Sequence, residues 1–189
     1  MTPEEFLAWE AEQPTKYEYS RSGIFAMAGA SRPHVTITPN LTIAIGVQLK
    51  GGSCRFQDAD TKLWVHAERA YYYPDGMVAC PPNFLESPQG AIDNPTVIFE
   101  VLSPSTHDRD LGEKMVAYLT IPTLREFVVI LSNSPAVTVY ERRGEEWMTR
   151  VTVGTDATTT LALSGLTLPH ADLYEGLEFD RVQVVPRGI

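Results

Sequence analysis

The chain has 189 residues, of which 43% are hydrophobic and 21% are charged, and its formal net charge is −9. This length suits one domain with a full hydrophobic core, and we expect a single domain over residues 1–179 and a tail at 180–189. No apolar run is long enough for a transmembrane helix, and the acidic start lacks the basic region of a secretory signal. The negative charge argues against a general nucleic-acid coat protein, because phosphate binding needs local Lys and Arg. It does not exclude an enzyme that takes nucleic acid at one metal-loaded site.

The first predicted element is a helix that begins with a capping box at Thr2–Glu5 and runs to about Gln13. Two short strands follow at 17–19 and 23–28, joined by a Ser-Arg-Ser-Gly turn.

The next element is predicted from a helical stripe, in which apolar residues recur every four positions: Ile37, Leu41, Ile45 and Leu49. Pro39 leaves two starts open. Either the helix begins at Thr38 with Pro39 in its first position, or it begins near Pro33 and kinks.

The remaining pattern alternates strands with turns. Strands are predicted at about 53–57, 61–66, 75–80, 96–102, 127–131, 136–142, 147–153 and 158–163. A second capping box at 110–113 predicts a helix to about Thr120, and a short helix is expected at 170–174. We therefore predict an α/β fold with a mixed, strongly curved β-sheet flanked by helices.

The two cysteines, Cys54 and Cys80, have no metal-ligand spacing. They suit a reducing cytoplasm, and we interpret both as structural. We expect a cytoplasmic protein.

Two acids stand beside apolar, strand-like runs. Asp75 precedes residues 77–79, and Glu100 lies inside 97–102. A carboxylate is costly to bury in such a run unless it is paired or binds a metal. Two of them on neighbouring strands would converge on a hard cation such as Mg²⁺. The alternative is that Asp75 only begins a turn and that Glu100 pairs with a surface arginine.

These acids belong to an ordered set of five motifs along the chain. The motifs are Tyr17-Glu18, Ala28-Gly29-Ala30-Ser31 with His34, Tyr73-Pro74-Asp75, Glu100-Val101-Leu102-Ser103-Pro104-Ser105-Thr106, and Gly112-Glu113-Lys114 with Tyr118. Together they resemble the Uma-two-type restriction endonuclease family, a branch of the PD-(D/E)XK nuclease-like fold, from about residue 3 to 176. The resemblance implies a restriction-endonuclease-like core.

The nuclease signature places a lysine two residues after the Glu, and this chain has Leu102 there. The resemblance implies that the lysine has moved to the following helix, as Lys114. The alternative is a solvated helix lysine that pairs with Asp110.

The resemblance also implies that Glu18 is a third acid near the metal and that His34 orients a water or a phosphate. Without the resemblance, Glu18 would be interpreted as a surface carboxylate and His34 as an ordinary residue at a helix start. Asp60 is a weaker candidate for the site, with Lys62 as a phosphate contact.

We thus expect a Mg²⁺-dependent endonuclease, with Mn²⁺ as an alternative ion, that hydrolyses nucleic-acid phosphodiester bonds, with DNA as the expected substrate. Asp75, Glu100, Glu18 and the carbonyl of Val101 would hold the metal, and Lys114 would orient the water. The alternatives are a non-catalytic nuclease-like binding module and a metal-dependent hydrolase of a small phosphorylated substrate.

Self-association as a homodimer or a higher homo-oligomer is expected as well, because cutting both strands of a duplex commonly uses two sites related by a two-fold axis. Apolar strand edges such as 137–140 could supply the contact.

Overall fold

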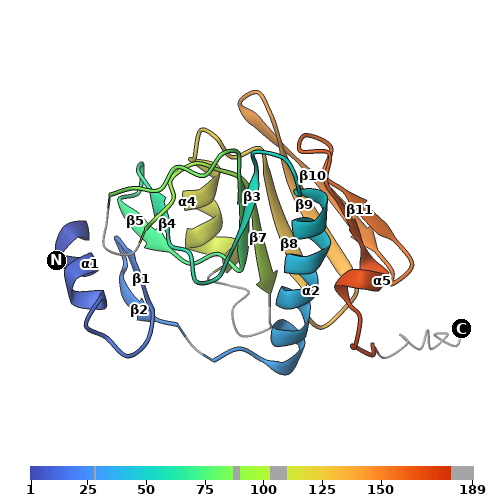
Figure 1. Ribbon diagram of the computed structural model, residues 1–189, viewed down its shortest axis with the longest axis horizontal. Helices are drawn as coiled ribbons and strands as arrows, with labels where there is room; N and C mark the ends of the chain where they lie inside the picture. The colour runs from blue at the N-terminus through green and yellow to red at the C-terminus, as the bar shows by residue number, and fades with distance from the viewer. Residues whose placement is uncertain (28, 87–89, 103–109, 180–189) are drawn as a thin grey trace, which may run out of the picture.

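A six-stranded mixed sheet forms the centre of the computed structural model, which describes residues 1–179 except 28, 87–89 and 103–109 (Figure 1). The strand order is β10-β9-β8-β7-β6-β3. The strands are β3 (Arg55–Asp58), β6 (Gly76–Ala79), β7 (Pro95–Leu102), β8 (Glu126–Leu131), β9 (Ala136–Arg143) and β10 (Glu146–Val153). Only β7 and β8 pair in parallel, and the sheet does not close. The predicted mixed sheet is confirmed, while the predicted tail at 180–189 lies outside the described residues.

One face of this sheet packs against α2 (Arg32–Gln48) and α5 (His170–Leu173), with the two-stranded sheet of β11 (Thr158–Thr160) and β12 (Thr167–Pro169) beside them. The buried side of α2 is the predicted stripe of Ile37, Leu41 and Ile45. The start near Pro33 is confirmed, and the helix continues through Pro39.

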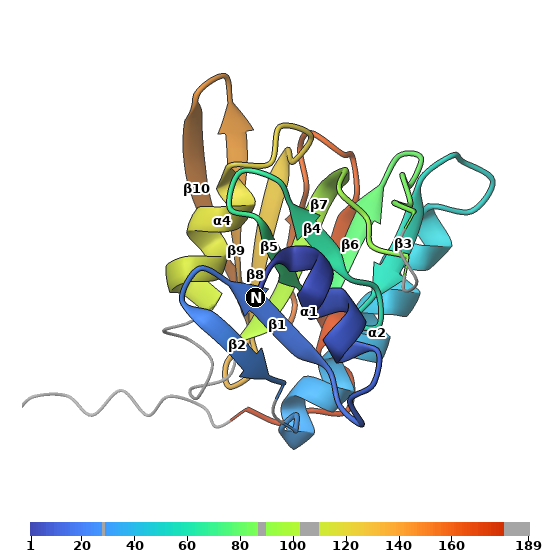
Figure 2. The ribbon, with the colours of Figure 1, turned by 90° about the vertical axis from the view of Figure 1, so that its left-hand side faces the viewer.

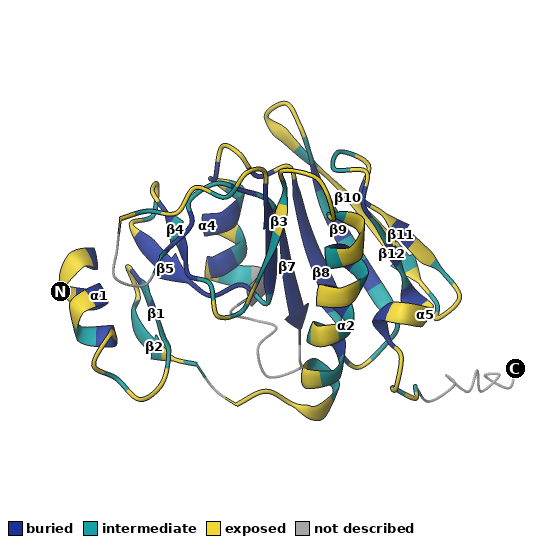
Figure 3. Cartoon of the chain, in the orientation of Figure 1, coloured by how far each residue is buried: buried dark blue, intermediate teal, exposed yellow. Residues whose placement is uncertain are grey.

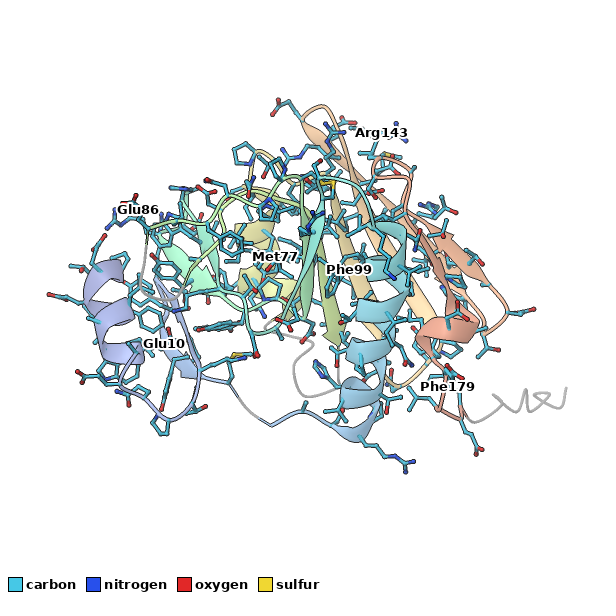
Figure 4. The ribbon with its side chains drawn as sticks, viewed as in Figure 1. Glu10, Met77, Glu86, Phe99, Arg143 and Phe179 are labelled. Atoms are coloured by element: carbon cyan, nitrogen blue, oxygen red, sulfur yellow. A yellow bond between two sulfur atoms is a disulfide. The ribbon has the colours of Figure 1, made fainter. Side chains whose placement is uncertain are left out.

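The other face packs against α4 (Met115–Leu119) and a four-stranded sheet. That sheet has the order β2 (Gly23–Ala26), β1 (Tyr17–Ser20), β5 (Ala70–Tyr72) and β4 (Leu63–Val65), and α1 (Pro3–Glu10) lies outside it (Figure 2). Figure 4 shows Met77 and Phe99 on opposite sides of the central sheet. Alternation along β7 therefore sends even-numbered residues such as Ile98 towards α4 and odd-numbered residues such as Phe99 towards α2.

Several predicted boundaries need correction. The capping box of the first helix is confirmed, but the helix ends at Glu10 and not at Gln13.

The second capping box does not open a regular α-helix. Residues 110–114 form a π-helical turn (η1, Asp110–Lys114) that breaks at Gly112, which has non-helical angles (φ −95°, ψ −107°), and the α-helix begins only at Met115. The side chain of Asp110 is outside the described part of the chain.

The cysteines also differ from expectation, since Cys54 and Cys80 form a disulfide instead of remaining reduced thiols. The reason is strand register. Arg55 pairs with Ala79 in β3 and β6, so the next two residues outward, Cys54 and Cys80, face each other. Their separation of 26 residues hides this proximity in the sequence.

The proposed dimer edge at 137–140 is wrong, because β9 pairs with β8 on one side and with β10 on the other. The outer strand is β10, which is largely exposed (Figure 3). Its exposed apolar side chains are Met148, Val151 and Val153. Among the described residues, no helix is long and apolar enough to span a membrane.

Candidate functional site

The two central acids lie opposite each other on neighbouring strands. Gly76 pairs with Phe99 in β6 and β7, so the register extended by one residue brings Asp75 opposite Glu100. Opposed residues of an antiparallel pair point to the same face of the sheet. This is the convergence that the sequence predicts for these acids.

Lys114 joins Glu100 to Glu18. The Lys114 Nζ lies 2.9 Å from Glu100 Oε1 and 3.2 Å from Glu18 Oε1. All three residues are at most 5% exposed. The Tyr118 hydroxyl, one helical turn after Lys114, donates to Glu100 Oε1 at 2.8 Å. We call Glu18, Glu100 and Lys114 the Lys114 cluster, and its geometry confirms that the ammonium points towards the acids and not into bulk water.

Asp75 sits at the outer edge of this cluster. Its Oδ2 accepts a hydrogen bond from the Val101 N–H at 2.7 Å, and its Oδ1 lies 2.9 Å from His34 Nε2. The side chains of Asp75 and His34 are 13% and 20% exposed, so this edge of the site meets solvent. His34 reaches it from the first turn of α2, where the positive end of the helix dipole favours a nearby carboxylate.

The donor chemistry of this site suits a hard divalent cation, because Asp75, Glu18 and Glu100 offer carboxylate oxygens. Within the described residues, however, no group of three or more His, Cys, Asp and Glu side chains is arranged to hold a metal ion. The ammonium of Lys114 lies where two of the acids meet, and it balances the charge of one of them. A cation would have to share those oxygens with Lys114 or take its place.

A second buried ion pair, not predicted from the sequence, lies next to the site. Lys62 is 1% exposed and forms a salt bridge with Glu10, which is 5% exposed; we call this pair the Lys62 cluster. Glu10 Oε1 also accepts from the Tyr73 hydroxyl at 2.9 Å and from the Tyr17 N–H at 3.0 Å. Burial lowers the pKa of Lys62, and the Glu10 partner opposes that shift.

Tyr73 connects the two clusters. Its hydroxyl binds Glu10, whereas its N–H donates to Glu18 Oε1 at 3.2 Å. Burial, and then the Glu10 charge, raise the pKa of this phenol, which therefore stays a donor. Figure 4 labels Glu10, the acid of the Lys62 cluster. The only sequence signal for Glu10 is a charge in the last turn of a helix whose other buried residues are apolar.

The two weaker candidates do not join the site. Lys62 cannot contact a phosphate, because it is buried against Glu10. Asp60 is exposed and pairs with Lys16. Two motif segments, Ala28 and 103–106, lie outside the described residues.

The fold belongs to a class of nuclease-like structures. The chain superimposes on the crystal structure described as "a putative nuclease belonging to DUF820 from Anabaena variabilis" with a TM-score of 0.72. The superposition covers 92% of this chain and 97% of the other, at 20% sequence identity. At that identity the similarity establishes the fold.

The family follows from the sequence comparison. Residues 3–171 match the Uma2 family, described as "Putative restriction endonuclease", and the chain belongs to that family. Two relatives from Synechocystis sp. are each 33% identical. "Uncharacterized protein slr1290" aligns over 95% of this chain and 94% of its own length, and "Uncharacterized protein sll1609" over 83% and 90%. The resemblance stated from the sequence motifs is thereby confirmed.

Proposed function

We propose that this protein is a metal-dependent endonuclease that hydrolyses nucleic-acid phosphodiester bonds, with DNA as its substrate, in the cytoplasm. One observation carries the proposal. Glu18 and Glu100 both form ion pairs with the buried Lys114, and the partly exposed Asp75 lies beside them. An incidental surface carboxylate would not be buried, opposed to a second acid across two strands, and paired with a lysine from a third element.

Asp75, Glu100, Glu18 and the carbonyl of Val101 are the groups that would hold Mg²⁺ or Mn²⁺. When bound, the cation would lower the pKa of a water molecule and stabilise the charge that develops on the phosphate. Lys114 would supply positive charge next to the reacting phosphate, because its ammonium already lies within 3.2 Å of two of the acids. His34 would fix the orientation of Asp75, since its Nε2 lies at hydrogen-bond distance from Oδ1.

The buried surroundings support this division of roles. Glu18, Glu100 and Lys114 are shielded from water, which strengthens every charge interaction among them. Asp75 and His34 are the partly exposed members, and a phosphodiester would approach from their side. The Val101 N–H holds Asp75 through the backbone, so the acid keeps its place next to β7.

The rival function is a non-catalytic nuclease-like binding module. One observation favours it: Glu18 and Glu100 already share one buried cation, the ammonium of Lys114. Such a module would keep this ion network for stability alone, so it would show neither metal binding nor cleavage.

The test is cleavage of mixed DNA and RNA with Mg²⁺ or Mn²⁺ by the wild type, D75N and D60N. We expect D75N to lose at least about 10²-fold in rate, as is typical when one charge-stabilising group is removed from an active site. D60N should cleave like the wild type, because Asp60 pairs with Lys16 away from the site.

Millimolar metal should raise the melting temperature of the wild type but not of D75N. Equal activity in D75N and wild type would refute the assignment, whereas no cleavage and no metal response in the wild type would establish the binding module.

We also propose a homodimer, with β10 as the contact. This strand has eight residues, one side of it is unpaired in the sheet, and Met148, Val151 and Val153 are exposed on it. Edge strands pair readily with another chain, and the charged residues on β10 that would oppose such pairing are Glu146 and Arg150. Sedimentation should therefore give a dimer for the wild type at tens of micromolar and a monomer for V151K. A monomeric wild type would contradict the proposal.

A further inference from the structure

The disulfide lies at the far end of the strand that begins next to Asp75. Cys54 and Cys80 face each other just beyond the Arg55–Ala79 pair of β3 and β6. Asp75 precedes the first residue of β6, and Cys80 follows its last. Cys80 is exposed, whereas Cys54 is half-buried. Cys80 is therefore the more accessible residue of the pair.

Both cysteines line a cavity of about 580 Å³. Its walls include Leu49, Val78 and Leu166, and its cationic members are Arg125 and Arg142. This volume lies in the range of small-molecule pockets in proteins. The cavity can thus admit a compound of a few hundred daltons directly to the disulfide.

The cavity has cationic guanidinium groups, and the carboxylate of Glu126 accepts hydrogen bonds from Leu163 and Ser164 of its wall. Arg125 and Arg142 line the cavity, and Arg55 Nη1 donates to the Cys54 carbonyl at 2.7 Å. Nearby guanidinium groups favour a thiolate over a thiol and make it a better leaving group. They also attract a molecule that carries carboxylates.

We propose that the Cys54–Cys80 pair is a thiol-exchange site, at which a low-molecular-weight thiol with carboxylate groups becomes attached to Cys80. The thiolate of the small molecule attacks Cys80 Sγ. A new S–S bond forms there, the Cys54–Cys80 bond breaks, and Cys54 leaves as a thiolate with the electron pair. A second small thiol then attacks the small-molecule sulfur of the mixed disulfide and frees Cys80. In sum, two small thiols are oxidised to their disulfide, and the protein disulfide is reduced to two thiols.

Thiol exchange at this disulfide would change the packing beside Asp75, because β3 connects the two places. The strand has four residues and, among the described strands, pairs only with β6, so the disulfide is its covalent anchor. Within β3, the Phe56 ring covers Gly76: a Cβ added to Gly76 would lie 2.5 Å from Phe56 Cζ. Gly76 is the neighbour of Asp75. Loosening β3 therefore loosens the packing beside Asp75, and this consequence for catalysis rests on the proposed nuclease function.

The direct test measures which cysteine reacts in the native protein. C54S leaves Cys80 as the single thiol, and C80S leaves Cys54. Each variant is exposed to glutathione disulfide in native buffer, and the adduct is followed by mass spectrometry. We expect one glutathione on Cys80 of C54S, with the C80S reaction at least about tenfold slower because Cys54 is less accessible. In the wild type, reduced glutathione should open the disulfide without denaturant, and R125Q should slow this step.

Stability supplies a second, independent measurement. Reduction of the wild type should lower its melting temperature by roughly 5–10 °C, and the same reductant should leave C54S/C80S unchanged. Hydrogen exchange should rise in β3 and β6 but not in α5. Two titratable thiols in the air-oxidised native protein, or equal adduct rates in C54S and C80S, would overturn the proposal. None of these measurements needs nuclease activity, so a protein that exchanges thiols but does not cleave DNA would refute only the proposed function.

Discussion

The two buried lysines of this protein sit in clusters of different charge balance. The Lys62 cluster joins one ammonium to one carboxylate, and the Tyr73 hydroxyl and the Tyr17 N–H complete the bonding of Glu10. The Lys114 cluster joins one ammonium to two carboxylates, with the partly exposed Asp75 beside it. Counted over its named members alone, the first cluster has equal numbers of ammonium and carboxylate groups, whereas the second has one carboxylate more than it has ammonium groups. The comparison teaches that burial alone does not distinguish the two clusters, whereas the ratio of carboxylates to ammonium groups does. Under the proposed function, a bound cation would balance the additional carboxylate of the Lys114 cluster.

The largest expected effect comes from breaking the balanced pair with K62M. Glu10 would remain buried without its counterion, and removal of one partner of a buried pair typically costs about 3–5 kcal/mol. For a chain of this size, the melting temperature should fall by roughly 6–20 °C. Added Mg²⁺ or Mn²⁺ should not restore it, because Glu10 is a single carboxylate whose Oε1 already accepts from the Tyr73 hydroxyl and the Tyr17 N–H.

The control for this prediction removes both charges. In E10Q/K62M neither partner is charged, so most of the lost stability should return. A double variant no more stable than K62M would show that Lys62 stabilises the fold through its packing on Phe6, Tyr71 and Tyr73, and not through Glu10.

The two clusters also differ in how far their residues could be predicted from the sequence. The ordered motifs placed Glu18, Glu100 and Lys114 in one site, and the strand patterns placed the two central acids on neighbouring strands. The sequence did not reveal the Lys62 cluster, because the partners are 52 positions apart and Glu10 stands in an ordinary amphipathic helix. This contact depends on how α1 packs against the four-stranded sheet, and no local pattern encodes that packing.

The same limit accounts for the disulfide. Cys54 and Cys80 meet because β3 pairs with β6 in one particular register, while the spacing in the chain indicates nothing about it. Short elements were missed for a related reason. The strands β5 and β12 have three residues each, too few for a period of two to appear. In contrast, the stripe of α2 repeats often enough to be recognised despite Pro39.

A smaller change in stability is expected from K114M, but this variant tests the proposed metal site directly. Without the ammonium, Glu18 and Glu100 lose the cation that lies between them, and the apo protein should be less stable than the wild type. A divalent cation would then no longer compete with this ammonium for those oxygens. We expect K114M to bind Mg²⁺ or Mn²⁺ at least about tenfold more tightly than the wild type, a difference of about 1.4 kcal/mol, and to show the larger rise in melting temperature with metal.

The exposed Lys50 offers a matched control, since K50M removes a charge of the same sign away from the site. A metal response that is equal in K114M, K50M and wild type would mean that Lys114 does not occupy the position of a cation. The Lys114 cluster would then be a structural ion pair like the Lys62 cluster, and the difference in charge balance would carry no functional meaning.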